Sequence, residues 1–364
     1  GFGVMAMTVA AERGFVTRSE ACQRVQRIVT FLAERATPYH GAFSHWIDGQ
    51  TGQTLPFSAD DNGADLVETG LLFQGLLTAR AYFDGADAAE SKLRADITAL
   101  WEAVEWDFFT KEGTEKVLYW HWSPDKGWAM NMPIQGWNEA LIVYVLAASS
   151  PTHPIGREVY AEGWARGGAM RNGKSFYDPV LPLGEDYGGP LFWAHYSFLG
   201  LNPRGLSDAY ADYWEQVCNH TRINYAYCVD NPKGYAGYGA DCWGLTASDI
   251  PDGYTASSPT NDRGVIAPTA ALSSMPYTPD ESMAALRFFY YKLGDKLWSD
   301  YGFIDAFDLT TGWFDRGMHI AIDQGPIVVM IENYRTGLPW NLFMSDKDVQ
   351  RGLAELGFTV EAGS

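Results

Sequence analysis

Two segments place carboxylates where acid–base chemistry needs them, and the first covers residues 60–68. It reads DDNGADLVE and opens a strongly periodic helical pattern. A helix that includes Asp61 would bring Asp61, Asp65 and Glu68 within an arc of about 60°, because successive residues turn by about 100°. The alternative is that Asp61 or Asn62 caps the helix and Asp65 complements its dipole. Capping explains Glu68 poorly, because Glu68 comes just before the apolar stripe.

The second segment, QGWNEA at residues 135–140, places Glu139 at the start of a helix that is otherwise almost free of charge. A charge at such a position must be paired, protonated or in contact with water. If Glu139 lines a cavity, burial and neighbouring carboxylates raise its pKa, as a general acid near neutral pH requires. The alternative is a residue that interacts only with the helix dipole.

Glycine-rich turns later in the chain carry a third group of candidates, within residues 185–196, 241–244 and 261–263. Each of these segments alone is more typical of a turn than of a site. The spacing of the single histidine in the first of them is not that of a metal site. The candidates are Asp186, Trp193, His195, Tyr196, Trp243, Asp262 and Arg263.

Other catalytic patterns are missing from the sequence. There is no GxSxG motif, no HExxH motif and no GxxxxGK loop followed by Ser or Thr. The four cysteines lack CxxC spacing, so we expect no metal site. Carboxylates and aromatic side chains remain. This combination is typical of glycosidic bond hydrolysis, in which one acid protonates the leaving oxygen and a second carboxylate activates water or attacks the anomeric carbon.

The composition narrows the range of partners. Asp and Glu number 45 against 26 Lys and Arg, and the net charge of −19 argues against binding to nucleic acid or anionic membranes. Aromatic residues make up 15% of the chain, and their rings either stack on sugars or fill a large core. No apolar run approaches the about 18 residues of a membrane span. No export signal is visible before Phe2. Cys228 and Cys242 either form a disulfide in an exported protein or stay buried thiols.

Helical periodicity dominates the sequence. It predicts twelve helices, at residues 4–13, 18–35, 64–83, 88–105, 137–148, 154–170, 190–199, 207–224, 265–275, 279–294, 322–336 and 345–357. Short turns join these helices in pairs, and longer loops separate the pairs. Six such hairpins predict an all-α fold, an (α/α)6 toroid or barrel with loop decorations, whose inner helices are apolar all round.

Strand-like segments are few and read as loop decorations. They are residues 117–122 with 127–132, which resemble a hairpin, and residues 225–229. No linker, charge run or break in composition marks a second domain. We therefore expect one catalytic domain over residues 1–364.

Six long segments, spread in order over nearly the whole chain, resemble the bacterial glucoamylase-like proteins, that is, the endo-β-1,2-glucanases of glycoside hydrolase family 144. The segments are GADLVETGLLFQGLLTAR, GWNEALIVYVLAASSPTHPI, GGPLFWAHYSFLGLNPRGLSD, NPKGYAGYGADCWGLTASD, DGYTASSPTNDRGVIAPTAALSSMPYTP and GWFDRGMHIAIDQGPIVVMIENYRTG. The resemblance implies an (α/α)6 barrel that hydrolyses β-1,2-glucan with inversion, without metal or cofactor.

The resemblance also implies roles for individual residues. The essential acids of the family match Asp61, Asp65 and Glu139, and Glu68 lies in the same motif. We expect Glu139 to be the general acid and Asp61 or Asp65 to activate the water, directly or through a relay. The expected subsite walls are Trp46, Trp120, Trp122, Trp137, Trp193, Tyr196, Trp243 and Trp313. The chain departs from the family at Gly1, where a short segment before the barrel is expected to be missing.

Three alternatives remain open. An exo-acting enzyme that releases sophorose, or a transglycosylase, would use the same barrel. A non-catalytic glucan-binding protein would keep the aromatic residues, but the retained acids argue against it. We expect a monomer in the periplasm or outside the cell, with a β-1,2-linked glucan or oligosaccharide as its partner and no nucleic acid.

Overall fold

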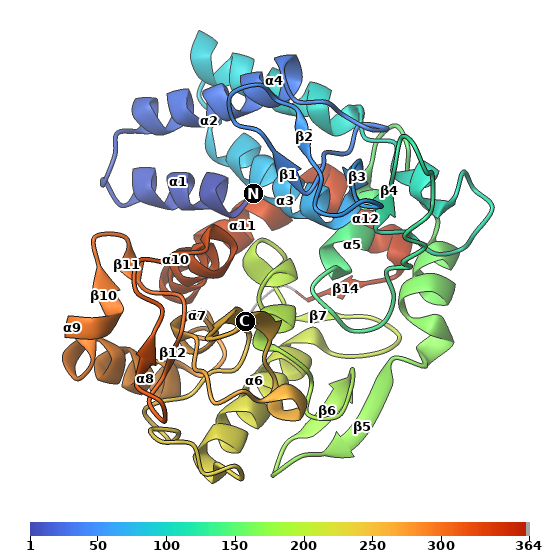
Figure 1. Cartoon of the computed structure of the whole chain (residues 1–364). Helices are drawn as coiled ribbons and strands as arrows, with labels where there is room; N and C mark the ends of the chain where they lie inside the picture. Colours follow the sequence, from blue (N-terminus) through green and yellow to red (C-terminus); the bar gives the residue numbers. More distant parts are fainter. Residues whose placement is uncertain (362–364) are drawn as a thin grey trace. The chain divides into compact units, whose positions relative to one another are not determined.

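The computed structural model describes residues 1–361, which fold mainly into helices joined by long loops (Figure 1). This confirms the expected helical class. The α-helices are α1 (Phe2–Glu12), α2 (Arg18–Glu34), α3 (Leu66–Tyr82), α4 (Ala88–Glu102), α5 (Leu141–Ser149), α6 (Tyr213–Asp230), α7 (Pro268–Leu272), α8 (Pro279–Tyr291), α9 (Gly294–Leu297), α10 (Ala321–Thr336), α11 (Leu338–Met344) and α12 (Lys347–Leu356). Shorter helical turns are Trp106–Thr110, Val159–Trp164, Arg166–Gly168, Leu191–Ala194, Ser197–Leu199 and Pro259–Asn261.

The strands are short and serve to fix loops. They are β1 (Trp46–Ile47), β2 (Thr54–Leu55), β3 (Ala64–Asp65), β4 (His121–Trp122), β5 (Arg171–Ser175), β6 (Val180–Leu183), β7 (Leu206–Ser207), β8 (Ala247–Ile250), β9 (Gly253–Ala256), β10 (Trp298–Ser299), β11 (Gly302–Phe303), β12 (Phe307–Asp308), β13 (Trp313–Phe314) and β14 (Thr359–Val360). Antiparallel pairs form between β1 and β2, β3 and β4, β5 and β6, β8 and β9, β10 and β11, and β12 and β13.

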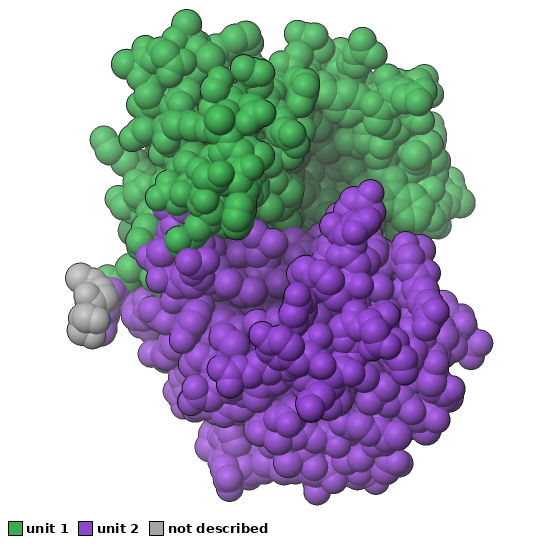
Figure 2. All heavy atoms as spheres, turned by 90° about the vertical axis from the view of Figure 1, so that its left-hand side faces the viewer, with its two compact units in different colours: residues 1–170, 200–202, 339–360 green, residues 171–199, 203–338, 361–364 purple. Residues whose placement is uncertain are grey.

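The chain divides into two compact units (Figure 2). Unit 1 comprises residues 1–170, 200–202 and 339–360, and unit 2 comprises residues 171–199, 203–338 and 361. Both acid segments identified in the sequence belong to unit 1.

In unit 1, α3 packs against α1, α4 and α5, and α12 packs against α5. Every residue of α5 is buried, which agrees with its lack of charge. Gly70 lets α3 approach α5 closely, because a Cβ atom there would lie 2.8 Å from Val143 Cγ2. At the start of α2, Thr17 and Glu20 form a reciprocal capping box. These contacts hold the first turns of α3 and α5 in one rigid part of the unit.

In unit 2, α7 packs against α8 and α10, and α6 packs against β6. An apolar cluster that includes Trp243, Phe289 and Phe307 fills the space beside α8. The hairpins β8–β9 and β12–β13 carry acidic residues, described below.

Several predictions of secondary structure are wrong. Residues 154–170 form no α-helix; the turn Val159–Trp164 has π geometry, and Gly167 then takes the left-handed conformation (φ 62°) that ends a helix. Residues 225–229 are not a strand, because α6 continues to Asp230 before Asn231 caps it in the left-handed conformation.

The expected hairpin of residues 117–122 and 127–132 is reduced to single bridges, between Tyr119 and Pro133 and between Ser123 and Gly127. Strand β4 pairs with β3 instead, which links two segments distant in sequence. All four cysteines are buried and free. Among residues 1–361, none of the helices combines the length and the apolar character that crossing a lipid bilayer requires.

Candidate active site

Asp65 fixes the start of α3, so the helix does not include Asp61 and the condition for a shared helical face is not met. Asp65 is the N-cap residue, and its Oδ1 accepts hydrogen bonds from the backbone N–H groups of Val67 (3.0 Å) and Glu68 (2.9 Å). Asp61 lies earlier, in a loop where its backbone N–H donates to Ser58 Oγ at 3.1 Å. Folding of the loop therefore gathers these acids, and they do not share one helical face.

Two histidines contact these aspartates: His45 contacts Asp65, and His121 lies near both Asp61 and Asp65. His45 Nδ1 lies 2.9 Å from Asp65 Oδ2. His121 Nε2 lies 3.4 Å from Asp61 Oδ2 and 3.7 Å from Asp65 Oδ2. The pairing of β3 with β4 places Asp65 opposite His121 and so sets this contact through the backbone. The result is a compact group of two aspartates and two histidines.

The two aspartates and His121 are buried, whereas the side chain of His45 is 28% exposed. Asp65 is fully buried, and Asp61 and His121 are 4% and 8% exposed. Asp61 Oδ1 and His121 Nδ1 have no hydrogen-bond partner within residues 1–361. Buried polar atoms are normally paired with protein or with ordered water. Asp61 Oδ1 can therefore accept a hydrogen bond from a water molecule.

Burial sets the ionisation of this group. Burial, aided by the charge of Asp65, raises the pKa of Glu68 to about 7. Burial also raises the pKa of Asp61, although the charge of His121 opposes the shift. Burial lowers the pKa of His45, but its hydrogen bond to Asp65 and the charge of that residue outweigh burial, so the pKa is raised. These shifts favour the protonated forms of Glu68 and Asp61 and the charged form of His45, compared with the same groups in water.

Glu139 lies in the turn just before α5, which begins at Leu141, and not within the helix as expected. Asn138 stabilises the turn just before the helix, because its Oδ1 accepts a hydrogen bond from the backbone N–H of Ala140 at 2.9 Å. Burial, together with the charges of Glu68 and Asp65, raises the pKa of Glu139 to about 7. Helices α3 and α5 pack together, and the charges of Glu68 and Asp65 act on Glu139, so the two acid segments lie near each other within unit 1.

An exposed aromatic pair lies beside the acids. Trp46 and Phe57 are each 52% exposed, and their ring centroids are 4.9 Å apart. The ring of Phe57 lies 4.5 Å from that of His45, the partner of Asp65. Flat apolar faces of this kind are surfaces on which sugar rings stack. This exposed position is consistent with the prediction that Trp46 forms a wall of a sugar subsite.

The other tryptophans of unit 1 differ in exposure. Trp120 is partly exposed and stacks on His121, with centroids 5.8 Å apart. Trp122 is partly exposed and packs edge-on against His40, at 4.8 Å. Trp137 is only 4% exposed, so most of its ring serves packing. Trp120 therefore remains a stronger candidate for substrate contact than Trp137.

Three candidates of unit 2 are buried and hydrogen-bonded to other protein groups, and their contact with substrate stays a prediction. Trp243 is fully buried, and its indole N–H donates to a backbone oxygen at 3.2 Å. His195 is 2% exposed, with Nε2 2.9 Å from Ser274 Oγ. Asp262 accepts hydrogen bonds from the hydroxyls of Tyr227 (3.0 Å) and Tyr238 (2.8 Å).

The remaining candidates of unit 2 keep partly or fully accessible side chains, Tyr196 excepted. Asp186 forms an exposed ion pair with Lys174 at 2.8 Å, and Arg263 donates to a neighbouring asparagine at 3.1 Å. Trp193 and Trp313 are partly exposed. Tyr196 is 5% exposed, and its hydroxyl donates to Asp323 Oδ1 at 3.2 Å.

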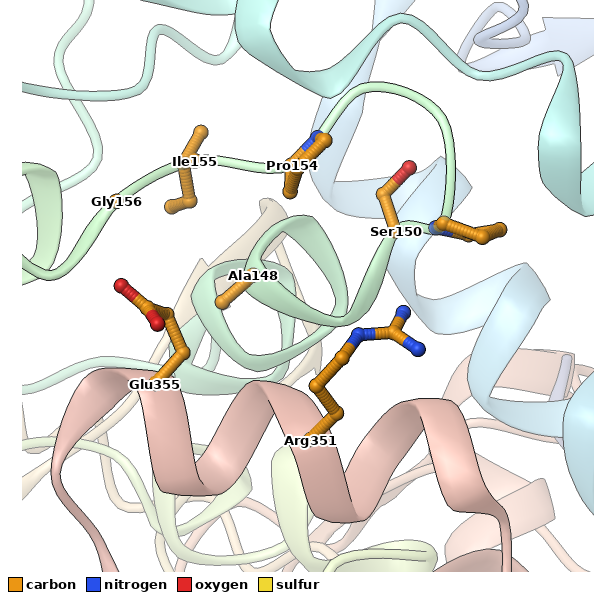
Figure 3. A pocket seen from close by; sticks show the side chains of 8 residues that line it. Ala148, Ser150, Pro154, Ile155, Gly156, Arg351 and Glu355 are labelled. Atoms are coloured by element: carbon orange, nitrogen blue, oxygen red, sulfur yellow. The ribbon is translucent and has the colours of Figure 1, made fainter.

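A separate pocket of unit 1, of about 580 Å³, lies between residues 148–156 and α12 (Figure 3). Arg351 and Glu355 line one side of it. The guanidinium of Arg351 already donates to the backbone oxygen of Ser149 at 2.6 Å and to Asp348 at 2.9 Å. With one exposed carboxylate and no aromatic wall, this pocket lacks the groups that glycoside hydrolysis requires.

His45, Asp61 and Asp65 could also hold a metal ion, because one ligand atom from each lies within 4.8 Å of the others. Asp65 is already committed, however, since its Oδ1 caps α3 and its Oδ2 contacts His45. Proton transfer is therefore the chemistry for which these residues are better arranged.

Residues 131–347 match the family model Glycoamylase, which describes a provisional glucoamylase. A Parabacteroides distasonis protein named exo β-1,2-glucooligosaccharide sophorohydrolase (non-reducing end) is 48% identical over 98% of this chain. The chain belongs to the Glycoamylase family. This chain spans about half, 52%, of the length of the Parabacteroides distasonis relative.

Two solved structures of related proteins are closely similar to this chain. An endo-β-1,2-glucanase from Chitinophaga pinensis, in complex with sophorotriose and glucose, is 52% identical with a TM-score of 0.95, covering 98% of this chain and 86% of that chain. A Bacteroides uniformis protein with a provisional glucoamylase name is 57% identical with a TM-score of 0.97, covering 100% of this chain and 88% of that chain.

Four residues of possible functional importance were not predicted from the sequence. They are His45, His121 and Phe57 in unit 1 and Asp323 in unit 2. Asp323 is 1% exposed and accepts hydrogen bonds from the hydroxyls of Tyr196 (3.2 Å) and Tyr254 (3.4 Å). Burial and the charge of a neighbouring carboxylate raise its pKa to about 8. Its signal in the sequence was an isolated acid at the start of an apolar helix, the same signal that identified Glu139.

Proposed function

We propose that this chain is a glycoside hydrolase that cleaves β-1,2-glucan, with endo action and inversion at the anomeric carbon. The observation that carries the proposal is the grouping of Glu139 with Asp61, Asp65 and Glu68 in unit 1, where burial keeps Glu139 partly protonated at neutral pH. The two relatives with β-1,2-glucan activities in their names, 48% and 52% identical, support the choice of substrate.

In the proposed reaction, Glu139 gives its proton to the glycosidic oxygen as the bond from that oxygen to the anomeric carbon breaks. A water molecule attacks the opposite face of the same carbon, and Asp61 accepts a proton from this water. Asp65 positions His45 and the start of α3, while Glu68 contacts the substrate. Trp46 is the proposed stacking surface for a sugar ring.

A second candidate is an exo-acting enzyme that releases sophorose from the non-reducing end. The observation that favours it is the name of the Parabacteroides distasonis relative, which is similar over 98% of this chain. Endo and exo enzymes would use the same acids and differ in the loops that close one end of the cleft.

Product analysis on linear β-1,2-glucan tests the proposal. A ladder of oligosaccharides is expected, and sophorose alone would establish the exo candidate. Products longer than the substrate would indicate a transglycosylase, and no products, with retained binding, would indicate a glucan-binding protein. Proton NMR of the first products should show the α-anomer before mutarotation, because inversion of a β-linkage yields it.

The proposal includes an (α/α)6 barrel formed by the helices as one catalytic domain of a monomeric protein, located in the periplasm or secreted. The helical class and the family support this architecture. Light scattering of the purified chain tests the monomer, and fractionation of the producing cells tests the location.

A further inference from the structure

Three aspartates of unit 2, Asp249, Asp305 and Asp315, converge at a place that the proposed reaction does not use. One carboxylate oxygen from each can be chosen so that all three oxygens lie within 4.8 Å of one another. The group offers oxygen ligands alone, without nitrogen or sulfur. Such ligands suit a hard cation, and they do not suit zinc.

The backbone brings these three residues together. Asp249 lies in β8, opposite Tyr254 of β9. Asp305 precedes β12 and Asp315 follows β13, so the hairpin formed by these two strands holds both residues near its base. The backbone N–H of Asp249 donates to Asp305 Oδ2 at 2.8 Å. The convergence is therefore fixed by two hairpins and the hydrogen bond between them.

Two oxygens of the group are sealed from solvent and unused. Asp305 is 0% exposed, and its Oδ1 has no hydrogen-bond partner within residues 1–361. Asp315 Oδ2 is buried in the same way and also lacks a partner in the described part of the chain. An ionised oxygen in such a place is strongly unfavourable unless a donor or a cation compensates it.

The surroundings add negative charge. Asp323 adds a fourth carboxyl, which is hydrogen-bonded to Asp305, and the side chains of Asp249 and Asp315 are hydrogen-bonded to each other. Carboxylates packed this closely must share protons or surround a cation.

We propose that Asp249, Asp305 and Asp315 bind a calcium ion that joins the β8–β9 hairpin to the β12–β13 hairpin. Calcium binds oxygens at about 2.3–2.6 Å, so opposite ligands lie up to about 5.2 Å apart. This span accommodates oxygens within 4.8 Å of one another. Magnesium demands near-ideal octahedral geometry at about 2.0–2.1 Å and usually keeps several waters, so the more flexible coordination of calcium suits three carboxylates held by the backbone better.

Calorimetric titration of the whole chain, treated with EDTA and then dialysed, tests the proposal with calcium chloride as the probe. We expect one site with a dissociation constant below about 1 mM, within the range of protein calcium sites. Magnesium chloride should bind at least 10-fold more weakly. Calcium should also raise the melting temperature, because it binds the folded state alone.

Asp315→Asn should weaken calcium binding at least 10-fold while circular dichroism stays that of the unaltered chain. Asp300→Asn is the matched control, because Asp300 is exposed in the turn between β10 and β11, and it should leave calcium affinity unchanged. If Asp315→Asn does not fold, Asp249→Asn takes its place with the same expectation.

Absence of calcium binding would overturn the proposal and leave shared protons as the explanation of the cluster. Equal affinity in Asp315→Asn and Asp300→Asn would overturn it as well. Loss of binding in Asp61→Asn alone would assign the ion to the group of His45, Asp61 and Asp65. Because the readout is binding, its failure leaves the proposed hydrolysis of β-1,2-glucan untouched.

Discussion

Glu139 is the residue on which the proposed reaction depends most directly. Replacing it with glutamine removes the proton donor and keeps the shape of the side chain, so we expect Glu139→Gln to lower kcat by about 10²- to 10⁴-fold. Glu115→Gln is the matched control, because Glu115 is exposed in the same unit. Release of reducing ends from linear β-1,2-glucan measures the effect. Full activity in a folded Glu139→Gln variant would exclude Glu139 as the general acid.

The raised pKa of Glu139 also predicts how stability depends on pH. Folding favours the protonated carboxyl, so its contribution to stability is fully present below the ordinary pKa of about 4.5 and is lost as the pH rises through about 7. Glutamine cannot ionise. We therefore expect the melting temperature of Glu139→Gln, relative to that of the unaltered chain, to increase as the pH rises from 5 to 8. A constant difference across this range would contradict the raised pKa.

The acids of the site could be found from the sequence, but their partners could not. Asp65 and Glu139 stand out because a charge at the start of an apolar helix requires an explanation. His45 and His121 carry no such signal, since neither precedes a helix. Their contacts with Asp65 arise from the β3–β4 pairing and from the loop that carries His45.

At the scale of elements, the close approach of α3 to α5 positions the acids. A methyl group on Gly70 would lie 2.8 Å from Val143 Cγ2, and a β-branched valine is stiff. Overpacking costs about 1–3 kcal/mol, which the better helix propensity of alanine offsets by about 1 kcal/mol. We expect Gly70→Ala to lower the free energy of unfolding, measured by urea denaturation, by up to about 2 kcal/mol. It should also lower kcat/KM by about 10- to 100-fold, because Glu139 is displaced.

A second substitution separates packing from other causes. Val143→Ala removes the methyl that meets the new side chain, so the double variant Gly70→Ala, Val143→Ala should regain most of the lost kcat/KM. Gly3→Ala is the matched control, since nothing lies within 4 Å of the position of its Cβ atom. If the double variant is no more active than Gly70→Ala, helix spacing does not position Glu139.

Elements with strong periodicity and clear caps could be predicted, and those that depend on distant partners could not. Helix α2 begins at the capping box of Thr17, and its expected limits of 18–35 are nearly those observed. The segment 154–170 has comparable periodicity, but Gly163, Gly167 and Gly168 allow tighter and left-handed turns that tertiary packing then selects. Strand β4 forms by pairing with β3, which lies more than 50 residues earlier. The local sequence pattern around β4 therefore could not predict it.

At the scale of the whole molecule, the net charge of −19 distinguishes between classes of substrate. A neutral glucan releases no counterions when it binds, so its affinity should change less than twofold between low and physiological salt. Calorimetry of Glu139→Gln with β-1,2-glucooligosaccharides measures this without consuming the ligand. The same increase in salt should raise the melting temperature of the chain slightly, because it screens the repulsion among excess carboxylates. A tenfold or greater loss of affinity would instead indicate a charged substrate, which the stacking surface of Trp46 and the proposed reaction would not explain.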